Sequence, residues 1–416
     1  MFVDSIKGCK FTQYLIMSND CSGKPMQMEK KKPSGYHIHK ALVVVMAVMA
    51  LLITRWSWMG GLDPLWVCVS SAAVFLLLFL RGRTFWRVVF FNLAAFFLIL
   101  ALFESYFVLK ARWNPGPVVH TEGVYDHMRD EVTGARMVPG SSRRAIKTVD
   151  GALLYDVQIT ADTNGLRISP PCESDSACGI LFFGDSFTFG EGVNDNETMP
   201  WRVGEALGNS YCIYNFALHG YGPHHMLALV EGGRVFPVVT HEVKDVIYEV
   251  LYPDHVFRLA GYFDWDVYGP WYELDDQGNP VRLGSFDTPG RLNAWTRWIL
   301  RSQLGSKAMY YFRYDRTKDK ERFVAVLLHT WELLQVQYPD ARFHLLLWDW
   351  TEGQDDVYFD RLRDAGILIH DVETFIPNGD KSNPDLKISP FDKHPNAACQ
   401  QLFADYVLAN IIQPCN

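Results

Sequence analysis

The chain has 416 residues, which exceeds one average domain and predicts at least two parts. Its formal net charge is -8 and its pI is near 5.9. No basic face is implied, which argues against nucleic acid as the main partner. Hydrophobic residues make up 49% of the chain, and the excess is concentrated between Ala41 and Leu109.

Three apolar stretches account for that excess. They are Ala41–Met59, Leu62–Leu80 and Val88–Leu109. Each approaches the roughly 20 residues that cross a bilayer core. Three such stretches in a row, joined by short polar links, predict three transmembrane helices rather than buried helices of a globular domain.

Basic residues around these stretches set the expected orientation. A lysine cluster at 24–40 precedes the first stretch, and three arginines at 81–87 separate the second from the third. By the positive-inside rule, both groups face the cytoplasm, although Lys110 and Arg112 oppose this weakly. The sequence thus predicts a multi-pass protein of the inner (cytoplasmic) membrane. Its expected parts are a cytoplasmic segment (1–40), a three-helix anchor (41–110), a linker and lead-in (111–150) and an outward-facing domain (151–416).

The cysteines fit an outer location. Cys172 and Cys178 bracket a short polar loop, so we expect a local disulfide between them in an oxidising compartment, with two free thiols as the alternative. Cys212, Cys399 and Cys415 then leave an odd count. No CxxC or Cys/His spacing typical of zinc is present, so we expect neither a metal nor a cofactor.

The domain from Gly151 onward alternates short apolar runs with helical patterns. This alternation predicts an α/β fold, a three-layer α/β/α sandwich with a mostly parallel sheet. After a first strand at 153–160, the buried strands are expected at 179–184, 211–217, 243–251, 343–348 and 367–370. The helices are expected at 200–206, 224–232, 320–337, 356–364 and 396–411. A long insert, about 257–316, contains a predicted hairpin near Asp275–Pro280.

A candidate nucleophile follows the strand at 179–184. The strand ends in Gly184-Asp185-Ser186, which places a hydroxyl at the carboxyl end of a central strand, where open α/β sheets gather ligands. A serine hydroxyl needs an adjacent base to attack a carbonyl, and the backbone amide at such a turn can bind an oxyanion. The alternative is that this tripeptide is only a turn.

A candidate base lies near the end of the sequence. Asp392 precedes His394 by two residues, so on an extended segment both side chains lie on one side of the backbone. The carboxylate can then orient the imidazole while its other nitrogen faces the serine. The alternative is an ordinary helix N-cap sequence with an exposed histidine.

These blocks, in this order, resemble the SGNH/GDSL hydrolase superfamily, and in particular its membrane-anchored bacterial envelope branch. The resemblance rests on the segments Thr163–Arg167, Gly184–Val193, Asn215–Pro223 and Asp392–Asn396. It implies that Ser186 is the nucleophile, that His394 and Asp392 complete the triad, and that the segment 215–223 supplies an oxyanion-hole amide.

Three departures from the family pattern concern the oxyanion hole and the triad spacing. The family has glycine where Ala217 stands, so the second amide comes from Ala217 or Gly220, beside that of Ser186. The family's asparagine donor is absent, and either Asp254 or His255 replaces it or the third donor is missing. The aspartate and histidine of the last block are two residues apart rather than three, a form that suits the envelope branch.

Four further residues and the insert are secondary candidates. His224 and His225 are expected to cap or pack a helix rather than bind metal. Glu191 contacts substrate or is a solvated loop carboxylate. Asp349 ends a strand on the same edge as Ser186 and is a secondary site candidate. The aromatic insert forms its own small core, or else a surface on which sugars stack.

The sequence therefore predicts a membrane-anchored serine esterase or O-acyltransferase. The resemblance implies acyl esters, above all acetyl esters, of envelope glycans such as polysaccharide or peptidoglycan as the substrate. A membrane-bound acyltransferase is a further candidate partner, as the acyl donor. The alternatives are a non-catalytic envelope scaffold or glycan-binding protein, and a lipid esterase at the membrane surface.

Overall fold

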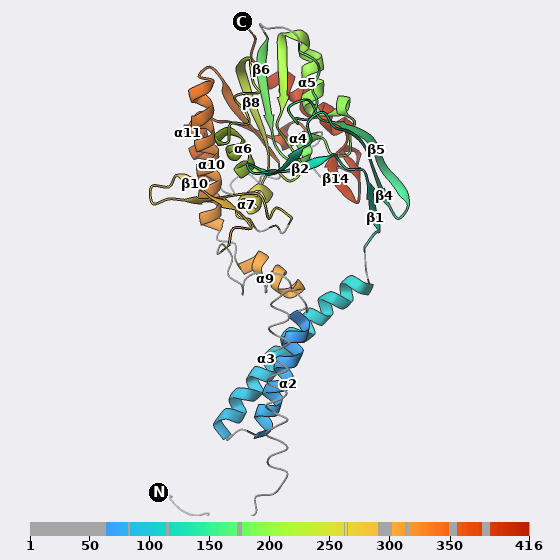
Figure 1. Cartoon of the computed structure of the whole chain (residues 1–416), viewed down its shortest axis with the longest axis vertical. Helices are drawn as coiled ribbons and strands as arrows, with labels where there is room; N and C mark the ends of the chain where they lie inside the picture. The colour runs from blue at the N-terminus through green and yellow to red at the C-terminus, as the bar shows by residue number, and fades with distance from the viewer. Residues whose placement is uncertain are drawn as a thin grey trace, which may run out of the picture.

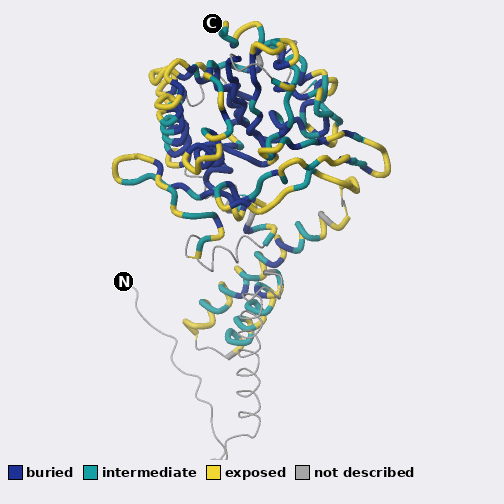
Figure 2. Tube along the Cα trace, turned by 45° about the horizontal axis from the view of Figure 1, so that its top comes forward, coloured by how far each residue is buried: buried dark blue, intermediate teal, exposed yellow. Residues whose placement is uncertain are grey.

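The computed structural model describes residues 64–81, 84–113, 116–172, 177–261, 263, 265–289, 302–312, 316–348, 356–376 and 383–415. Two apolar helices, α2 (Pro64–Arg81) and α3 (Thr84–Trp113), lie side by side and form a stalk. A globular α/β body stands at one end of this stalk (Figure 1). Buried residues gather in the body, whereas most of the stalk is exposed or half-buried (Figure 2).

The two stalk helices can be compared with the predicted anchor of three transmembrane helices. Within α3, the 27 residues Thr84–Lys110 have the length and composition to cross a membrane, with a mean hydropathy of 2.2. The apolar helix Leu65–Leu80 is shorter. The expected first span, Ala41–Met59, lies outside the described residues. The described part of the chain thus holds one helix of spanning length, and it does not support the prediction of three.

The centre of the body is a five-stranded parallel sheet in the order β12-β11-β8-β6-β7. Its strands are β6 (Cys178–Phe183), β7 (Tyr211–Asn215), β8 (Glu242–Leu251), β11 (Arg342–Trp348) and β12 (Leu368–Asp371). From β6 the chain moves outward to β7 and then returns to β8 on the other side of β6. The boundary between β6 and β8 is therefore the topological switch point, where doubly wound sheets bind ligands. The predicted α/β fold with a parallel sheet is confirmed.

Alternating apolar residues of the strands bury both faces of the sheet. Ile180 and Phe182 of β6 face the layer of α5 (Met199–Leu207) and α12 (Ala397–Asn410). Leu181 and Phe183 face the opposite layer. That second layer contains α6 (Pro223–Glu231), α10 (Arg316–Gln337) and α11 (Asp356–Asp364). Continuous apolar runs such as 180–183 are what a strand covered on both faces requires.

The segment between the stalk and β6 is more regular than the sequence suggested. An antiparallel sheet joins β1 (Val119–Glu122), β4 (Ser142–Val149) and β5 (Ala152–Thr160). A separate hairpin joins β2 (His127–Asp130) and β3 (Gly134–Met137). The expected linker and irregular lead-in at 111–150 therefore contains the four strands β1 to β4. Their apolar pattern is weak because only one face is covered: in β4, only Ala145 and Val149 are buried.

Two disulfides join segments that are distant in sequence. They connect Cys172 with Cys212 and Cys178 with Cys415, with Cα–Cα distances of 5.3 and 5.7 Å. The predicted Cys172–Cys178 bridge is wrong. Cys178 begins β6 and faces the layer of α12, and the end of the chain packs into that same layer. Cys212 lies beside Gly179 in the β6–β7 ladder, so strand pairing rather than sequence proximity decides the partners.

Shorter elements surround the carboxyl edge of the sheet. They are α4 (Ser186–Phe189), α7 (Asp254–Leu259), the hairpin β13 (Lys387–Ser389) and β14 (Asp392–Pro395), and the hairpin β9 (Pro270–Leu274) and β10 (Pro280–Ser285). The β9–β10 hairpin turns at Asp275–Asn279, as predicted. In the described part of the insert, α9 (Gln303–Phe312) lies against the stalk, where Glu104 accepts the Gln303 and Leu304 amides at 2.7 and 2.8 Å.

Candidate active site

Ser186 is the first residue of α4 and directly follows β6 at the switch point. Asp185 caps this helix, because its carboxylate accepts the Phe187 amide at 2.9 Å. Gly184 is required before the turn, since a Cβ there would clash with the Thr188 hydroxyl. As the first helical residue, Ser186 has an N–H that the helix itself does not use. The side chain is 4% exposed.

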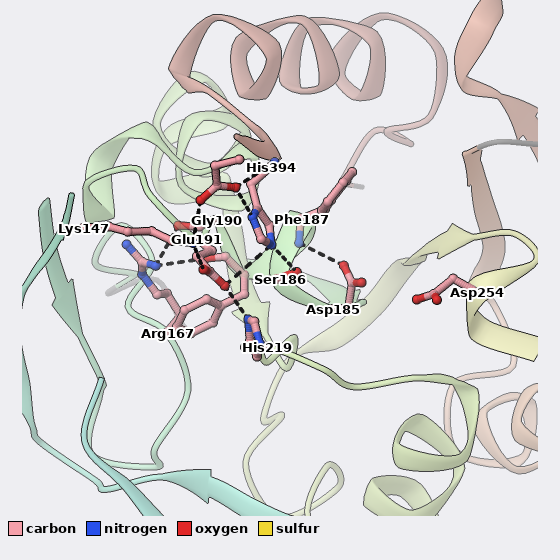
Figure 3. Close-up of polar contacts among 12 residues, drawn as sticks. Lys147, Arg167, Asp185, Ser186, Phe187, Gly190, Glu191, His219, Asp254 and His394 are labelled. Carbon is pink, nitrogen blue, oxygen red and sulfur yellow. Dashed lines mark hydrogen bonds and ion pairs between the residues drawn. The ribbon is translucent and has the colours of Figure 1, made fainter. Parts of the chain in front are cut away.

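The structure brings His394 and Asp392 to this serine. His394 Nε2 lies 2.9 Å from Ser186 Oγ, and His394 Nδ1 lies 2.5 Å from Asp392 Oδ1 (Figure 3). Both residues belong to β14, which pairs with β13 just before α12. Their two-residue spacing on an extended strand directs both side chains toward α4, as the sequence pattern predicted.

The electrostatics of the pair favour a charged imidazole. Burial opposes charge on His394, but the Asp392 hydrogen bond and the charges of Glu191 and Asp392 outweigh it, so its pKa is raised above the ordinary 6.5. Burial also opposes charge on Asp392, but hydrogen bonds from His394 and Lys147 and the histidine charge hold the pKa of that carboxyl well below its usual range. Asp392 is therefore an anion that stabilises the imidazolium when a proton arrives.

Lys147 is a site residue that the sequence did not reveal. Its Nζ lies 2.7 Å from Asp392 Oδ2 and 3.7 Å from Glu191 Oε1. Lys147 comes from β4, within the stretch expected to be a linker. A lysine on a half-covered strand carries no sequence signal that distinguishes it from a solvated surface lysine.

Arg167 has a structural role in the family-like segment Thr163–Arg167. Arg167 is 1% exposed, and its guanidinium donates to the carbonyls of Gly190 and Val193 at 3.1 and 2.9 Å. It also pairs with Asp195 at 3.0 Å, and although burial lowers its pKa to about 10, it stays charged near neutral pH. Arg167 thus fixes the loop that follows α4 and contains Glu191.

Glu191 lies beside His394 rather than in open solvent. Its side chain is 17% exposed, its Oε2 contacts His219 Nδ1, and the same oxygen lies 3.6 Å from His394 Nε2 (Figure 3). Burial opposes its charge, but the His219 hydrogen bond and the charges of His394, His219 and Lys147 lower its pKa. The sequence left Glu191 between a substrate contact and a solvated carboxylate, and the structure places it within the cluster around Ser186.

The two expected oxyanion amides of the second block differ in their surroundings. The Ala217 amide donates to Asn215 Oδ1 at 3.1 Å, so it already has an acceptor in the protein. Gly220 adopts φ +81° in the turn after His219, and a Cβ there would come within 2.6 Å of the Trp265 ring. The packed turn at 218–221 therefore requires glycine.

The candidates for the third oxyanion donor have other partners. Asp254 pairs with Arg258 at 2.7 Å, and in Figure 3 it lies on the far side of Asp185 from Ser186. His255 is fully buried, with Nδ1 at 2.8 Å from the Tyr248 hydroxyl and Nε2 at 3.4 Å from Asp185 Oδ2. These contacts give no support to either residue as the replacement for the family's asparagine.

Arg258 instead connects the two loops of the site. Its Nη1 lies 2.9 Å from Asp185 Oδ2 and donates to the Tyr221 carbonyl at 2.8 Å. Burial opposes charge on Asp185, yet Arg258 and His255 hold its pKa well below its usual range. Asp185, which precedes Ser186, is thus a buried, paired anion with a structural role.

A second buried carboxyl group lies beneath α4. Glu249 of β8 is 2% exposed, and its Oε2 accepts the Thr188 hydroxyl at 2.6 Å. Burial and the charge of Asp185 raise its pKa to about 8, against a weaker opposite effect of the Thr188 hydrogen bond. Glu249 is therefore mainly neutral at pH 7.

His224 and His225 are buried at the start of α6 and share Asp266. His224 Nε2 lies 3.0 Å and His225 Nε2 3.5 Å from the Asp266 carboxylate. His225 Nδ1 accepts the Gly222 amide at 3.1 Å, so Nε2 carries the ring proton. These packing and capping contacts match the expected role of the two histidines. The secondary candidate Asp349 lies outside the described residues.

Comparisons with known proteins give structural likeness only. No family model and no curated protein matches the chain. One similar solved structure is a member of the lipolytic G-D-S-L family from Veillonella parvula, with 15% identity, a TM-score of 0.33, and 56% of this chain and 98% of that chain covered. Another is a lipase from a goat rumen metagenome, with 11% identity, a TM-score of 0.33, and 58% and 100% covered.

A third is a Corynascus enzyme of carbohydrate esterase family 2 with its carbohydrate-binding domain. It is 14% identical, has a TM-score of 0.30, and matches 63% of this chain and 70% of its own. The chain is thus similar to G-D-S-L lipolytic proteins and carbohydrate esterases. All three TM-scores are below 0.5, so the functional proposal rests on the site geometry.

Proposed function

We propose that this protein is a serine esterase or O-acyltransferase, held at a membrane by its N-terminal helices. The observation that carries the proposal is the 2.9 Å contact between Ser186 Oγ and His394 Nε2, with Asp392 behind the imidazole at 2.5 Å. These distances are those of a nucleophile, its base and the group that orients the base.

The reaction begins with proton transfer to His394. Nδ1 donates its hydrogen to Asp392, so the Nε2 lone pair faces the serine and accepts its proton. Ser186 Oγ then attacks the ester carbonyl and a tetrahedral oxyanion forms. The imidazolium passes its proton to the leaving alcohol, and an acyl-serine remains. The unused Ser186 amide at the start of α4 is the first donor to the oxyanion, together with an amide of the 217–220 turn.

The second half-reaction separates an esterase from an acyltransferase. His394 removes a proton from water or from a sugar hydroxyl, which attacks the acyl-serine and releases Ser186. The family resemblance supports acetyl esters of envelope polysaccharide or peptidoglycan as the substrate class. In the transfer direction, a membrane-bound acyltransferase is the proposed source of the acyl group.

If the helices lie in the membrane and the body lies outside the cytoplasm, two further observations are explained. Within α3, the span Thr84–Lys110 presents large apolar side chains, including Phe91 and Leu102, that are more than half exposed. A bilayer would cover them. The basic residues at 24–40 and 81–87 orient the body outward, and both disulfides suit an oxidising compartment.

Substitution of the two reacting residues tests the proposal. In the full-length chain purified in detergent, Ser186→Ala and His394→Ala should each reduce release of p-nitrophenol from its acetate ester by at least about 1,000-fold. Ser210→Ala is the matched control, because Ser210 is exposed at the end of a surface turn. Activity retained in either site variant would remove that residue from the mechanism.

A non-catalytic envelope scaffold or glycan-binding protein is the second candidate function. Its support is the pairing of Asp254 with Arg258, which leaves the usual third oxyanion donor unreplaced. A fluorophosphonate probe distinguishes the two, because an activated Ser186 becomes labelled and an inert one does not.

The apolar stalk also suits a lipid esterase. Comparing turnover of acetylated xylan with that of short-chain lipid esters separates this option from glycan esters.

A further inference from the structure

Three side chains with metal-binding atoms converge beside Ser186. Glu191 Oε2, His219 Nδ1 and His394 Nε2 all lie within 4.8 Å of one another. They come from the loop after α4, the turn after β7 and strand β14, and they point toward a common centre in Figure 3. We propose that this cluster binds a divalent transition-metal ion, with Zn²⁺ preferred, and that the bound ion reversibly blocks the base His394.

The donor set matches zinc chemistry. Two imidazole nitrogens and one carboxylate oxygen are ordinary zinc ligands, with bonds of about 2.0–2.2 Å. Ligand atoms around a tetrahedral ion then lie about 3.3 Å apart. His394 Nε2 and Glu191 Oε2 are already 3.6 Å apart, and His219 Nδ1 contacts the same oxygen. Small side-chain rotations are sufficient to admit the ion, and a water completes the fourth position.

His394 also has the second contact that metal-bound histidines require. A ligating histidine usually donates its other ring N–H to a carboxylate, which fixes the tautomer and directs the lone pair at the metal. Asp392 makes this contact at 2.5 Å, so the Nε2 lone pair is directed into the cluster. On binding, the His219 proton moves from Nδ1 to Nε2 by exchange with solvent, which leaves the Nδ1 lone pair for the metal.

Charge and access favour a cation at this position. The carboxylates of Glu191 and Asp392 face the cluster, and Lys147 offsets only one of them. The His219 side chain is 49% exposed, so one of the three ligands is directly accessible from solvent.

Two other clusters among the described residues are less suitable. His225 Nδ1 accepts the Gly222 amide, so Nε2 holds its proton toward Asp266 and offers no lone pair. In the cluster of Cys172, Cys212 and His241, both sulfurs are committed to a disulfide. At the mouth of the site, by contrast, each of the three ligand atoms can present a lone pair.

The consequence of binding is inhibition. The lone pair that zinc occupies is the one that takes the Ser186 proton, so the hydroxyl loses its base while the ion is present. The blocking effect rests on the proposed esterase function, but the binding itself does not.

Binding is measured first with Ser186→Ala, which separates it from turnover. Calorimetric titration of the full-length protein, purified without a histidine tag, should give one zinc ion per chain. His219→Ala should bind at least about tenfold more weakly, because one of three protein ligands is removed. His329→Ala is the control, since His329 forms a Glu–His pair with Glu332 on α10 and has no role in the cluster. Absence of binding, or equal binding by His219→Ala, would overturn the proposal.

Inhibition is measured with the wild-type chain and p-nitrophenyl acetate. Zinc should suppress hydrolysis, EDTA should restore it, and His219→Ala should need at least about ten times more zinc for half-inhibition. Mg²⁺, which prefers oxygen ligands, should have no effect at the same concentration. If the enzyme is inert from the start, the proposed function fails while calorimetry still decides the metal site. If the enzyme is active but zinc inhibits wild type and His219→Ala equally, only the metal site fails.

Discussion

Lys147 Nζ lies 2.7 Å from Asp392 Oδ2, although the two residues are 245 positions apart. The contact joins the antiparallel sheet next to the stalk to the strand that contains His394. Lys147 binds the Asp392 oxygen that His394 leaves free, and thereby fixes the plane of the carboxylate. The sheet that precedes the α/β layers thus contributes a residue to the candidate active site.

Removal of that lysine should affect turnover more than binding. We expect Lys147→Met to lower kcat about tenfold, equivalent to about 1.4 kcal/mol, with KM nearly unchanged. Loss of the positive charge also stabilises the imidazolium, so the acid limb of the pH–rate profile should move to higher pH. A purely structural role would not shift that limb. Arg144→Met on the same strand, where exposed Arg144 pairs with Asp156, should leave both quantities unchanged.

The pKa of His394 predicts the pH dependence of the wild-type enzyme. The base must be neutral to take the Ser186 proton, and its pKa is raised above 6.5. Activity should therefore rise with pH through a midpoint above 6.5. Glu191→Gln removes one of the charges that raise this pKa, so its midpoint should shift to lower pH. Profiles of kcat/KM against pH measure both, with the exposed Glu205→Gln as control. An unchanged midpoint in Glu191→Gln would contradict the electrostatic role of Glu191.

Glu249 predicts a loss of stability with rising pH. Its folded-state pKa is about 8, above the ordinary 4.5. The carboxyl therefore favours folding fully below about pH 4.5, and this contribution is lost as the pH rises through 8. Urea unfolding at pH 5 and pH 8 should show a fall of about 1–3 kcal/mol in wild type. That fall should be smaller in Glu249→Gln, whose side chain stays neutral. An equal fall in both proteins would assign the pH dependence to other groups.

The disulfide between Cys178 and Cys415 should be a major source of stability. It closes a sequence separation of 237 residues, and loss of such a bridge typically costs about 2–5 kcal/mol. We expect this loss in the double variant Cys178→Ser/Cys415→Ser, measured by urea unfolding. Non-reducing peptide mapping of wild type should recover the 178–415 and 172–212 pairs. A 172–178 peptide would instead support the pairing first read from the sequence.

The sequence predicted the parts of the fold that depend on local patterns. Apolar runs covered on both faces marked the five parallel strands, and the Asp392–His394 spacing on an extended segment directed both side chains to one side. Contacts between distant segments left no such pattern. Lys147 lies on a half-covered strand, and Cys415 finds its partner only through the packing of α12. The Ala217 amide has an acceptor because Asn215 folds back on it, which neither residue type alone predicts.

The contact between Glu104 and the start of α9 has a mechanical consequence. A domain joined to its anchor by one flexible connection sweeps a hemisphere above the bilayer. Here, the contact of Glu104 with α9 gives the body a second attachment to the stalk. With the proposed membrane anchor, this attachment would restrict that swivel and hold Ser186 near one height above the bilayer. On a membrane, such an enzyme would select substrates by their distance from the lipid surface as well as by their chemistry. Polymers that extend through that layer would be modified only over the stretch that passes it.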